Sequence, residues 1–328
     1  MFQKKPITIY RCIIRDAFWL TWRRKSLWVF GIFAAFISTG GVLDVATAGL
    51  HRIQSNGDFF AQMLKTSFVG FTLFGQYVRQ FNAIGPVWTT ILFVCTTLVG
   101  IGLVMIAVLS QASLIHGIKS PIKLHPRHIR KEASVHIWSL FTVDILTKIG
   151  SALLVSVSIL PVWWFYTQAT SISLFFVFIQ LLIFLPAILI LNIIALLSII
   201  HIIETGSSVS KAILVAWNIF RKHWLASFEF ALILFILISL CGLFLFAVGI
   251  ILSVPFAIMY STTLLSGSFA LFFVANILFG LFALFLVLMF GGSVVTFQYA
   301  AWYLFYKQTG HEIHTKTALS KILRMFHK

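Results

Sequence analysis

Acidic side chains are scarce in this chain, which has 8 Asp and Glu against 24 Lys and Arg in 328 residues. Charged residues of both signs make up 10% of the chain, whereas a soluble domain carries about 25%. A soluble fold of this length could not bury a hydrophobic content of 60%, so lipid must solvate much of the surface. A net charge of +16 suggests nucleic acid in a soluble protein. Here the charges lie between apolar runs, so the sequence favours a membrane and excludes a nucleic-acid partner.

Cysteine and recognisable catalytic motifs are also scarce. Cys12, Cys95 and Cys241 are far apart and form no CxxC pair, which argues against a zinc site or a disulfide framework. The chain contains no glycine-rich phosphate loop, no Ser/His/Asp set and no HExxH. We therefore predict no enzymatic activity, no cofactor and no metal. The two His/Glu groups supply too few ligands for a metal ion; they are His201 with Glu204, and His311 with Glu312 and His314.

What the chain has in abundance is long apolar runs. A membrane-spanning helix needs about 20 such residues. Six runs qualify, and they cover 27–48, 87–115, 149–167, 172–203, 225–253 and 267–306. The sequence predicts an all-α polytopic membrane protein of about six spans plus interfacial helices. We expect the third run to end in a turn near Pro161, and the long sixth run to tilt, to break near Gly291-Gly292 or to pass beyond the interface.

Basic residues favour the predicted loops on one side, whereas the first loop on the other side contains Arg52, Lys65 and Arg79. They concentrate before the first span, between spans two and three, between spans four and five, and in the tail at 307–328. Segments 161–171 and 254–268, on the other side, carry no charge. By the positive-inside rule, we expect both termini to be cytoplasmic and the number of spans to be even.

Two basic aromatic segments stand out, Trp19-x-x-Trp22-Arg23-Arg24 and Trp217-x-x-Phe220-Arg221-Lys222. Each ends a stretch with helical apolar periodicity, at 7–22 and 209–222, and each leads into a long apolar run. Such helices lie in the membrane interface with their apolar stripe toward lipid. We predict that the following residues anchor the chain to anionic headgroups: Trp19, Trp22, Arg23, Arg24, Trp28, Trp217, Arg221, Lys222 and Trp224.

A weaker amphipathic stretch at 130–148 suggests an internal repeat of one interfacial helix followed by two spans. The three units would cover 7–115, 126–203 and 207–306. The alternative is that each cytoplasmic entry point independently requires basic and aromatic anchors. A further interfacial helix is predicted on the opposite side within 49–86, with a re-entrant segment at 66–75 as the alternative.

The segment from Ala17 to Gly31, AFWLTWRRKSLWVFG, resembles the N-terminus of a diffuse bacterial family of six-span inner-membrane proteins. That family is related to the membrane domain that precedes some glycerophosphodiester phosphodiesterases. The segment from Ala212 to Leu225 resembles the family's second hallmark, an amphipathic element. The resemblance implies architecture only, because these motifs determine topology and the chain has no cluster of Glu, Asp and His for a phosphodiesterase.

Polar residues inside the spans are the remaining candidates for chemistry. Glu229 lies about one turn inside span five. One interpretation is a proton or cation relay; the other is an interfacial acid that pairs with Lys222 or Arg221. Three polar or helix-breaking residues interrupt span four: Gln180, Pro186 and Asn192. They could form a transporter binding site, or Pro186 could simply kink the helix while the two amides bind neighbouring helices. Asp144 and Lys148 have the i, i+4 spacing of a local ion pair, and we expect one.

Two functional hypotheses from different classes follow. The first is a non-catalytic membrane protein that binds lipid or a partner through its interfacial helices, as a scaffold or accessory protein of the envelope. The alternative is a small transporter or permease with a polar site near the kinked fourth span. An intramembrane enzyme has the least support, because no two acids or histidines are placed to converge.

Overall fold

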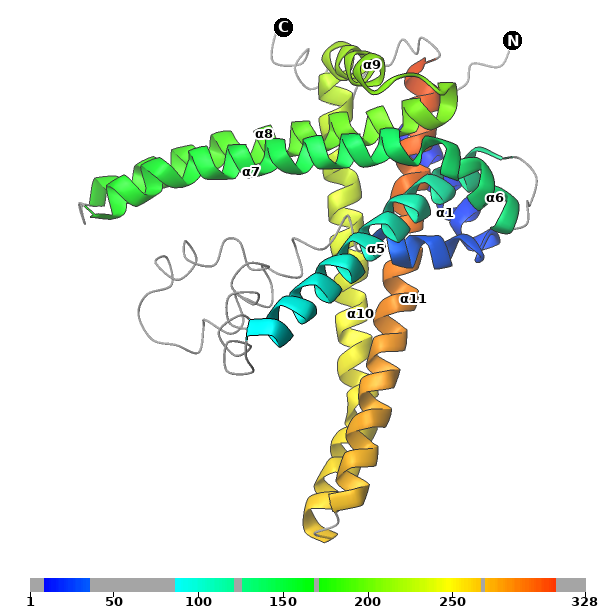
Figure 1. Ribbon diagram of the computed structural model, residues 1–328, viewed down its shortest axis with the longest axis vertical. Helices are drawn as coiled ribbons and strands as arrows, with labels where there is room; N and C mark the ends of the chain where they lie inside the picture. The colour runs from blue at the N-terminus through cyan, green and yellow to red at the C-terminus, as the bar shows by residue number, and fades with distance from the viewer. Residues whose placement is uncertain (1–8, 36–85, 121–125, 168–170, 267–268, 311–328) are drawn as a thin grey trace, which may run out of the picture.

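The computed structural model describes residues 9–35, 86–120, 126–167, 171–266 and 269–310, which are almost entirely helical and contain no strand (Figure 1). After the first helix, residues 27–35 are also helical. The helices are α1 (Ile9–Arg23), α5 (Pro86–Lys119), α6 (Pro126–Ala133), the 3-10 turn η1 (Ser134–His136), α7 (Ile137–Thr167), α8 (Ser171–Thr205), α9 (Val209–Lys222), α10 (Trp224–Ser266) and α11 (Phe269–Gly310).

Five of these helical stretches are long and apolar enough to cross a membrane. They cover Phe93–Lys119, Arg127–Leu154, Leu182–Thr205, Trp224–Thr262 and Phe273–Thr309. Their surfaces expose many large apolar side chains, Phe235, Leu243 and Phe285 among them, which water would not solvate favourably. The chain is therefore an all-α polytopic membrane protein.

Several predicted segments lie partly or wholly outside the described residues. Of the first predicted span, 27–35 is helical and the rest is outside. The outer segment 49–86, with its alternative at 66–75, and most of the tail at 307–328 are outside as well. The interfacial helices predicted at 7–22 and 209–222 correspond to α1 and α9, and of these two ranges only residues 7 and 8 lie outside the described part. The predicted anchoring residues are all described.

Two long hairpins extend from one common junction. Helices α7 and α8 pack along each other, as do α10 and α11, and in Figure 1 the first pair lies crosswise to the second. Helix α5 leaves the same junction on its own diagonal path. The buried side chains of the described residues are concentrated at this junction.

The junction is built from the C-terminal ends of α5, α8 and α11, and we call it the hub. These three ends contact one another pairwise. Their apolar side chains are almost completely buried, because each end faces the other two. The fully buried residues include Leu114 and Ile115 from α5, Leu197 and Ile200 from α8, and Ala300 and Ala301 from α11.

Short helices cover the hub in a regular order. Helix α6 packs on α5, α9 packs on α8, and α1 packs on α11. In the first two cases the short helix packs on the long helix just before it in the chain. Helix α1 packs instead on α11, the last long helix among the described residues, which closes the order into a cycle.

A close approach between glycines joins the segment 27–35 to α11. A Cβ atom built on Gly292 would lie 2.6 Å from the carbonyl oxygen of Trp28, and one built on Gly31 would collide with the carbonyl oxygen of Gly292. Thr296 Oγ1 also donates to the carbonyl of Leu27 at 3.3 Å. Only residues without a side chain allow two backbones to come this close. Gly291, one residue away, faces open space.

The structure differs from the sequence expectations in two places, and in a third it excludes one of the alternatives. The stretch 130–148 is no single helix, because η1 interrupts it and its second half continues into α7. Helix α7 passes through Pro161 and ends at Thr167. Helix α11 is unbroken through Gly291-Gly292, so the excess length of the sixth run is not resolved by a break.

Candidate functional site

Helix α1 has two different apolar faces. Ile13, Ala17 and Thr21 are buried against the hub, whereas Phe18 and Trp19 are more than half exposed. The apolar stripe of 7–22 was expected to face lipid. For Ala17 and Thr21 this expectation was wrong, because these two side chains are buried against protein. The apolar surface available to lipid is the second face, which includes Phe18, Trp19 and Trp22.

Helix α9 shows the same division. Ala212, Ala216 and Phe220 are buried against the hub, so the predicted stripe of 209–222 also packs on protein. Leu214 and Trp217 form the exposed apolar face. Arg221, Lys222 and Trp224 at the end of this element are exposed, as anchoring residues need to be.

Two exposed tryptophans of α1 are covered by basic side chains. The Arg23 guanidinium lies 5.3 Å from the Trp19 ring centroid, and the Lys25 ammonium lies 5.6 Å from that of Trp22. Both distances are within the range of a cation–π contact. The pairs place positive charge directly beside exposed aromatic surface, the combination that suits an anionic headgroup region.

Two predicted anchors instead hold the protein together. Arg24 Nη1 donates to the carbonyls of Gly117 at 2.6 Å and Ser120 at 2.7 Å, at the C-terminus of α5. The last carbonyls of a helix lack partners within the helix, so Arg24 acts as a cap. Trp28 is half-buried, and its indole N–H donates to the carbonyl of Thr21 at 3.0 Å.

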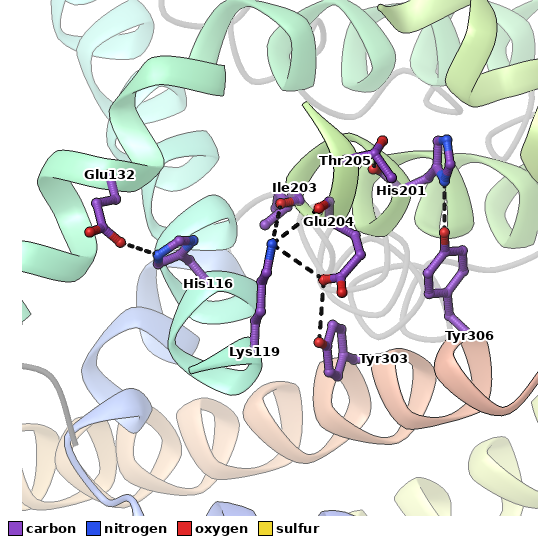
Figure 2. Close-up of polar contacts among 9 residues, drawn as sticks. All are labelled: His116, Lys119, Glu132, His201, Ile203, Glu204, Thr205, Tyr303 and Tyr306. Atoms are coloured by element: carbon purple, nitrogen blue, oxygen red, sulfur yellow. Dashed lines mark hydrogen bonds and ion pairs between the residues drawn. The ribbon is translucent and has the colours of Figure 1, made fainter. Parts of the chain in front are cut away.

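A polar cluster occupies one side of the hub (Figure 2). Lys119 Nζ, at the end of α5, donates to the carbonyls of Ile203 at 3.2 Å and Glu204 at 3.1 Å, and pairs with the Glu204 carboxylate at 3.5 Å. The Tyr303 hydroxyl of α11 donates to the same carboxylate at 3.3 Å. One lysine thus caps α8, and one carboxylate joins all three hub helices.

The histidines in this region each have a partner. His116 of α5 contacts the Glu132 carboxylate of α6, and His201 Nδ1 lies 2.7 Å from the Tyr306 hydroxyl (Figure 2). His201 and Glu204 therefore interact with different groups and do not converge on a metal ion. Within the described part of the chain, no group of three or more His, Cys, Asp or Glu is arranged to hold a metal.

A second polar group lies deeper between α5, α7 and α11. Gln111 Nε2 donates to the Tyr299 hydroxyl at 2.8 Å, with both side chains buried. The Oε1 atom of Gln111 and the Oδ2 atom of Asp144 are buried without a hydrogen-bond partner. Asp144 and Lys148 form no direct salt bridge among the described residues, although the charge of Lys148 acts on the Asp144 carboxyl as the i, i+4 spacing predicts.

Glu229 is buried near the start of α10, and the Tyr10 hydroxyl of α1 donates to its carboxylate at 2.9 Å. Burial, together with this hydrogen bond, raises the pKa of the Tyr10 hydroxyl well above its usual value, so Tyr10 remains a donor. The expected pairing with Arg221 or Lys222 is absent among the described residues. Glu229 therefore joins α1 to α10.

The residues of the candidate polar site in span four are not brought together with Glu229. Asn192 is exposed, and its amide donates to the carbonyl of Ile188 in its own helix at 2.8 Å. Pro186 is half-buried within α8, which continues through it. The side chain of Gln180 lies outside the described residues.

A groove of about 780 Å³ runs between α1 and α10. Its walls are mainly apolar and include Ile14, Phe18, Leu232 and Leu237. Arg11 and Arg15, one helical turn apart on α1, line it together with Tyr10 and Glu229, and the opposite end reaches Cys241. Its volume is within the range of about 300–1,000 Å³ that is typical of small-molecule sites.

Sequence reasoning missed the polar residues of the hub as a group. Gln111 was passed over inside an apolar run, and Lys119 was treated as a loop charge. One signal could have found them: polar side chains recur near the C-terminal ends of the second, fourth and sixth apolar runs. The groove had no such signal, because its residues come from segments more than two hundred positions apart.

No protein-family model matches this chain, and no curated protein or solved structure shows a significant similarity to it.

Proposed function

We propose that this chain is a non-catalytic membrane protein that binds anionic lipid through the short helices around its hub, as a scaffold or accessory protein of the envelope. One observation carries the proposal: α1 and α9 each expose an apolar aromatic face beside basic side chains after their other apolar face is buried. A helix that only stabilised the fold would have no need of the second face. Clusters of basic residues attract anionic lipid by about 1 kcal/mol per charge near the surface.

The proposed location is the cytoplasmic side of a bacterial inner membrane. The support is the distribution of Lys and Arg in the sequence, which favours cytoplasmic short helices and termini. The resemblance of Ala17–Gly31 to a family of bacterial inner-membrane proteins points the same way. The proposed internal repeat of 7–115, 126–203 and 207–306 gains support from the cyclic packing of α1, α6 and α9 on the long helices.

The test is the composition of the lipid shell retained by the protein. The protein is reconstituted into a mixture of phosphatidylglycerol and phosphatidylcholine and extracted in mild detergent, and the retained lipid is quantified. We expect phosphatidylglycerol to be enriched over the starting mixture. The double variant Arg23→Gln/Lys25→Gln should reduce the enrichment, whereas Arg23→Lys/Lys25→Arg should preserve it. Equal retention of both lipids, or an unchanged enrichment in the Gln variant, would overturn the proposal.

A further inference from the structure

The groove between α1 and α10 combines two features that the anchoring surface does not explain. One is a continuous apolar trough, made by Ile14 and Phe18 on one side and Leu232 and Leu237 on the other. The other is a pair of exposed arginines, Arg11 and Arg15, which are among the residues that border the same groove. Trp19, Arg23 and Lys25, which carry the proposed function, are not among its lining residues.

The length of the groove matches one leaflet. Its wall on α10 extends from Glu229 to Cys241. At a rise of 1.5 Å per residue, this stretch is about 18 Å long. The hydrocarbon core of a bilayer is about 30 Å thick, so half of it is close to this length. An acyl chain from one leaflet therefore fits the groove from its charged end to its apolar end.

The positive charges of Arg11 and Arg15 beside the groove favour an anionic headgroup. Both arginines are exposed, and they are spaced so that their side chains lie on the same side of α1. Arg15 contacts Asp16 at 3.5 Å in an exposed pair, which solvent weakens. Glu229, which also lines the groove, accepts the Tyr10 hydroxyl and so belongs to the contact between α1 and α10. Guanidinium forks bind phosphate with two parallel hydrogen bonds, so this end suits a phosphodiester.

We propose that this groove holds one anionic phospholipid from the surrounding leaflet, with an acyl chain between α1 and α10 and the phosphate on Arg11 and Arg15. The inference rests on the proposed function and adds to it a single defined site. Occupancy would join α1 to α10 through the lipid, in addition to the Tyr10–Glu229 hydrogen bond. The bound lipid would then be part of the folded structure and not of the exchanging shell.

The test is native mass spectrometry of the full-length protein, delipidated in detergent and titrated with phosphatidylglycerol or with phosphatidylcholine. We expect one phosphatidylglycerol molecule to bind with high affinity and phosphatidylcholine to bind more weakly. Arg11→Gln/Arg15→Gln should weaken phosphatidylglycerol binding at least tenfold, or by about 1.4 kcal/mol, because the phosphate loses both charged donors. Lys307→Gln is the control, because it removes one charge from an exposed residue that does not line the groove, and it should leave this binding step unchanged.

A second pair of variants tests the apolar wall. Leu237→Trp fills the groove and should abolish the single binding step, whereas Leu240→Trp, on the exposed side of α10, should preserve it. A melting temperature measured for each variant shows that the fold is retained. Equal affinity for the two lipids, or binding unaffected by both Arg11→Gln/Arg15→Gln and Leu237→Trp, would overturn the inference.

The remaining occupant to test is the chain's own N-terminus. If deletion of residues 2–8 strengthens lipid binding at this step, those residues fill the groove in the native protein and the lipid inference fails. The two proposals fail separately. If the lipid shell is not enriched in phosphatidylglycerol but one phosphatidylglycerol still binds with high affinity, the proposed function is contradicted. If the shell is enriched but no high-affinity phosphatidylglycerol binds, only the site between α1 and α10 is contradicted.

Discussion

At the scale of single residues, Arg23 and Arg24 show how neighbours in a basic segment can have different roles. Arg23 is exposed and lies over Trp19, whereas Arg24 reaches two carbonyls at the C-terminus of α5. We expect Arg24→Ala to lower the free energy of unfolding by about 1.5–3 kcal/mol, because the change leaves helix-end carbonyls without a donor. Arg23→Ala should cost less than about 1 kcal/mol.

The measurement is thermal or denaturant unfolding of both variants in the same detergent. The two substitutions remove the same charge from adjacent positions, so they differ only in the contacts of the side chain. Equal melting temperatures for the two variants would show that Arg24 does not cap α5.

Gly291 and Gly292 offer a second comparison of neighbours. A methyl group on Gly292 would collide with the backbone of the segment 27–35, whereas one on Gly291 meets nothing within 4 Å. We expect Gly292→Ala to destabilise the protein by about 1–3 kcal/mol through overpacking. Gly291→Ala should be neutral or stabilising by up to about 1 kcal/mol, since alanine favours a helix. The same unfolding assay measures both, and a Gly292→Ala protein as stable as the wild type would contradict the close approach.

His223 gives the structure a pH dependence. It lies at the turn between α9 and α10, where burial, and then the charge of Lys222, lower the pKa of its imidazole below 6.5. The unfolded chain therefore binds a proton more readily than the folded chain, so stability falls as the pH drops through 6.5 and below. We expect melting temperatures to decline over this range, and His223→Gln to make the decline shallower. A decline of the same steepness in the variant would exclude this role.

At the scale of elements, the periodicity of the sequence predicted α1 and α9 almost to the residue, because an amphipathic stripe and a basic end mark such a helix. The stripe could not say what it faces. Ala17 and Ala216 pack as well on a protein hub as on lipid, and only the tertiary structure separates the two. The exposed aromatic residues, such as Trp19 and Trp217, were the better signal for the lipid side.

The candidate site was less predictable than the helices. The Tyr10–Glu229 and Lys119–Glu204 contacts join residues that are 219 and 85 positions apart, and no local pattern encodes such pairs. Asp144 and Lys148 show a prediction that is partly confirmed. Their spacing predicted a local charge interaction, which forms without a direct salt bridge, but it could not predict that the Oδ2 atom of Asp144 is buried without a hydrogen-bond partner.

At the scale of the whole molecule, three long helices meet at one hub while their hairpins diverge from it (Figure 1). Helix α10 has 43 residues, which gives a length of about 65 Å, roughly twice the thickness of the hydrocarbon core. Most buried side chains of the described residues lie at the hub. The short helices around the hub are therefore the elements best placed to determine how deeply the protein lies in the membrane.

The account is tested most directly by the membrane depth of the short helices. In a variant with Cys12, Cys95 and Cys241 replaced by serine, spin labels are placed singly at the exposed apolar positions Phe18, Val135 and Leu214. The polar controls are Asp16 and Lys211 on the same helices as Phe18 and Leu214, and Lys131 of α6, which adjoins the η1 turn that contains Val135. In nanodiscs containing anionic lipid, the account predicts that the three apolar positions are accessible to oxygen at headgroup depth, and that the controls are accessible to a water-soluble nickel complex. Apolar positions as accessible to nickel as their controls would contradict it.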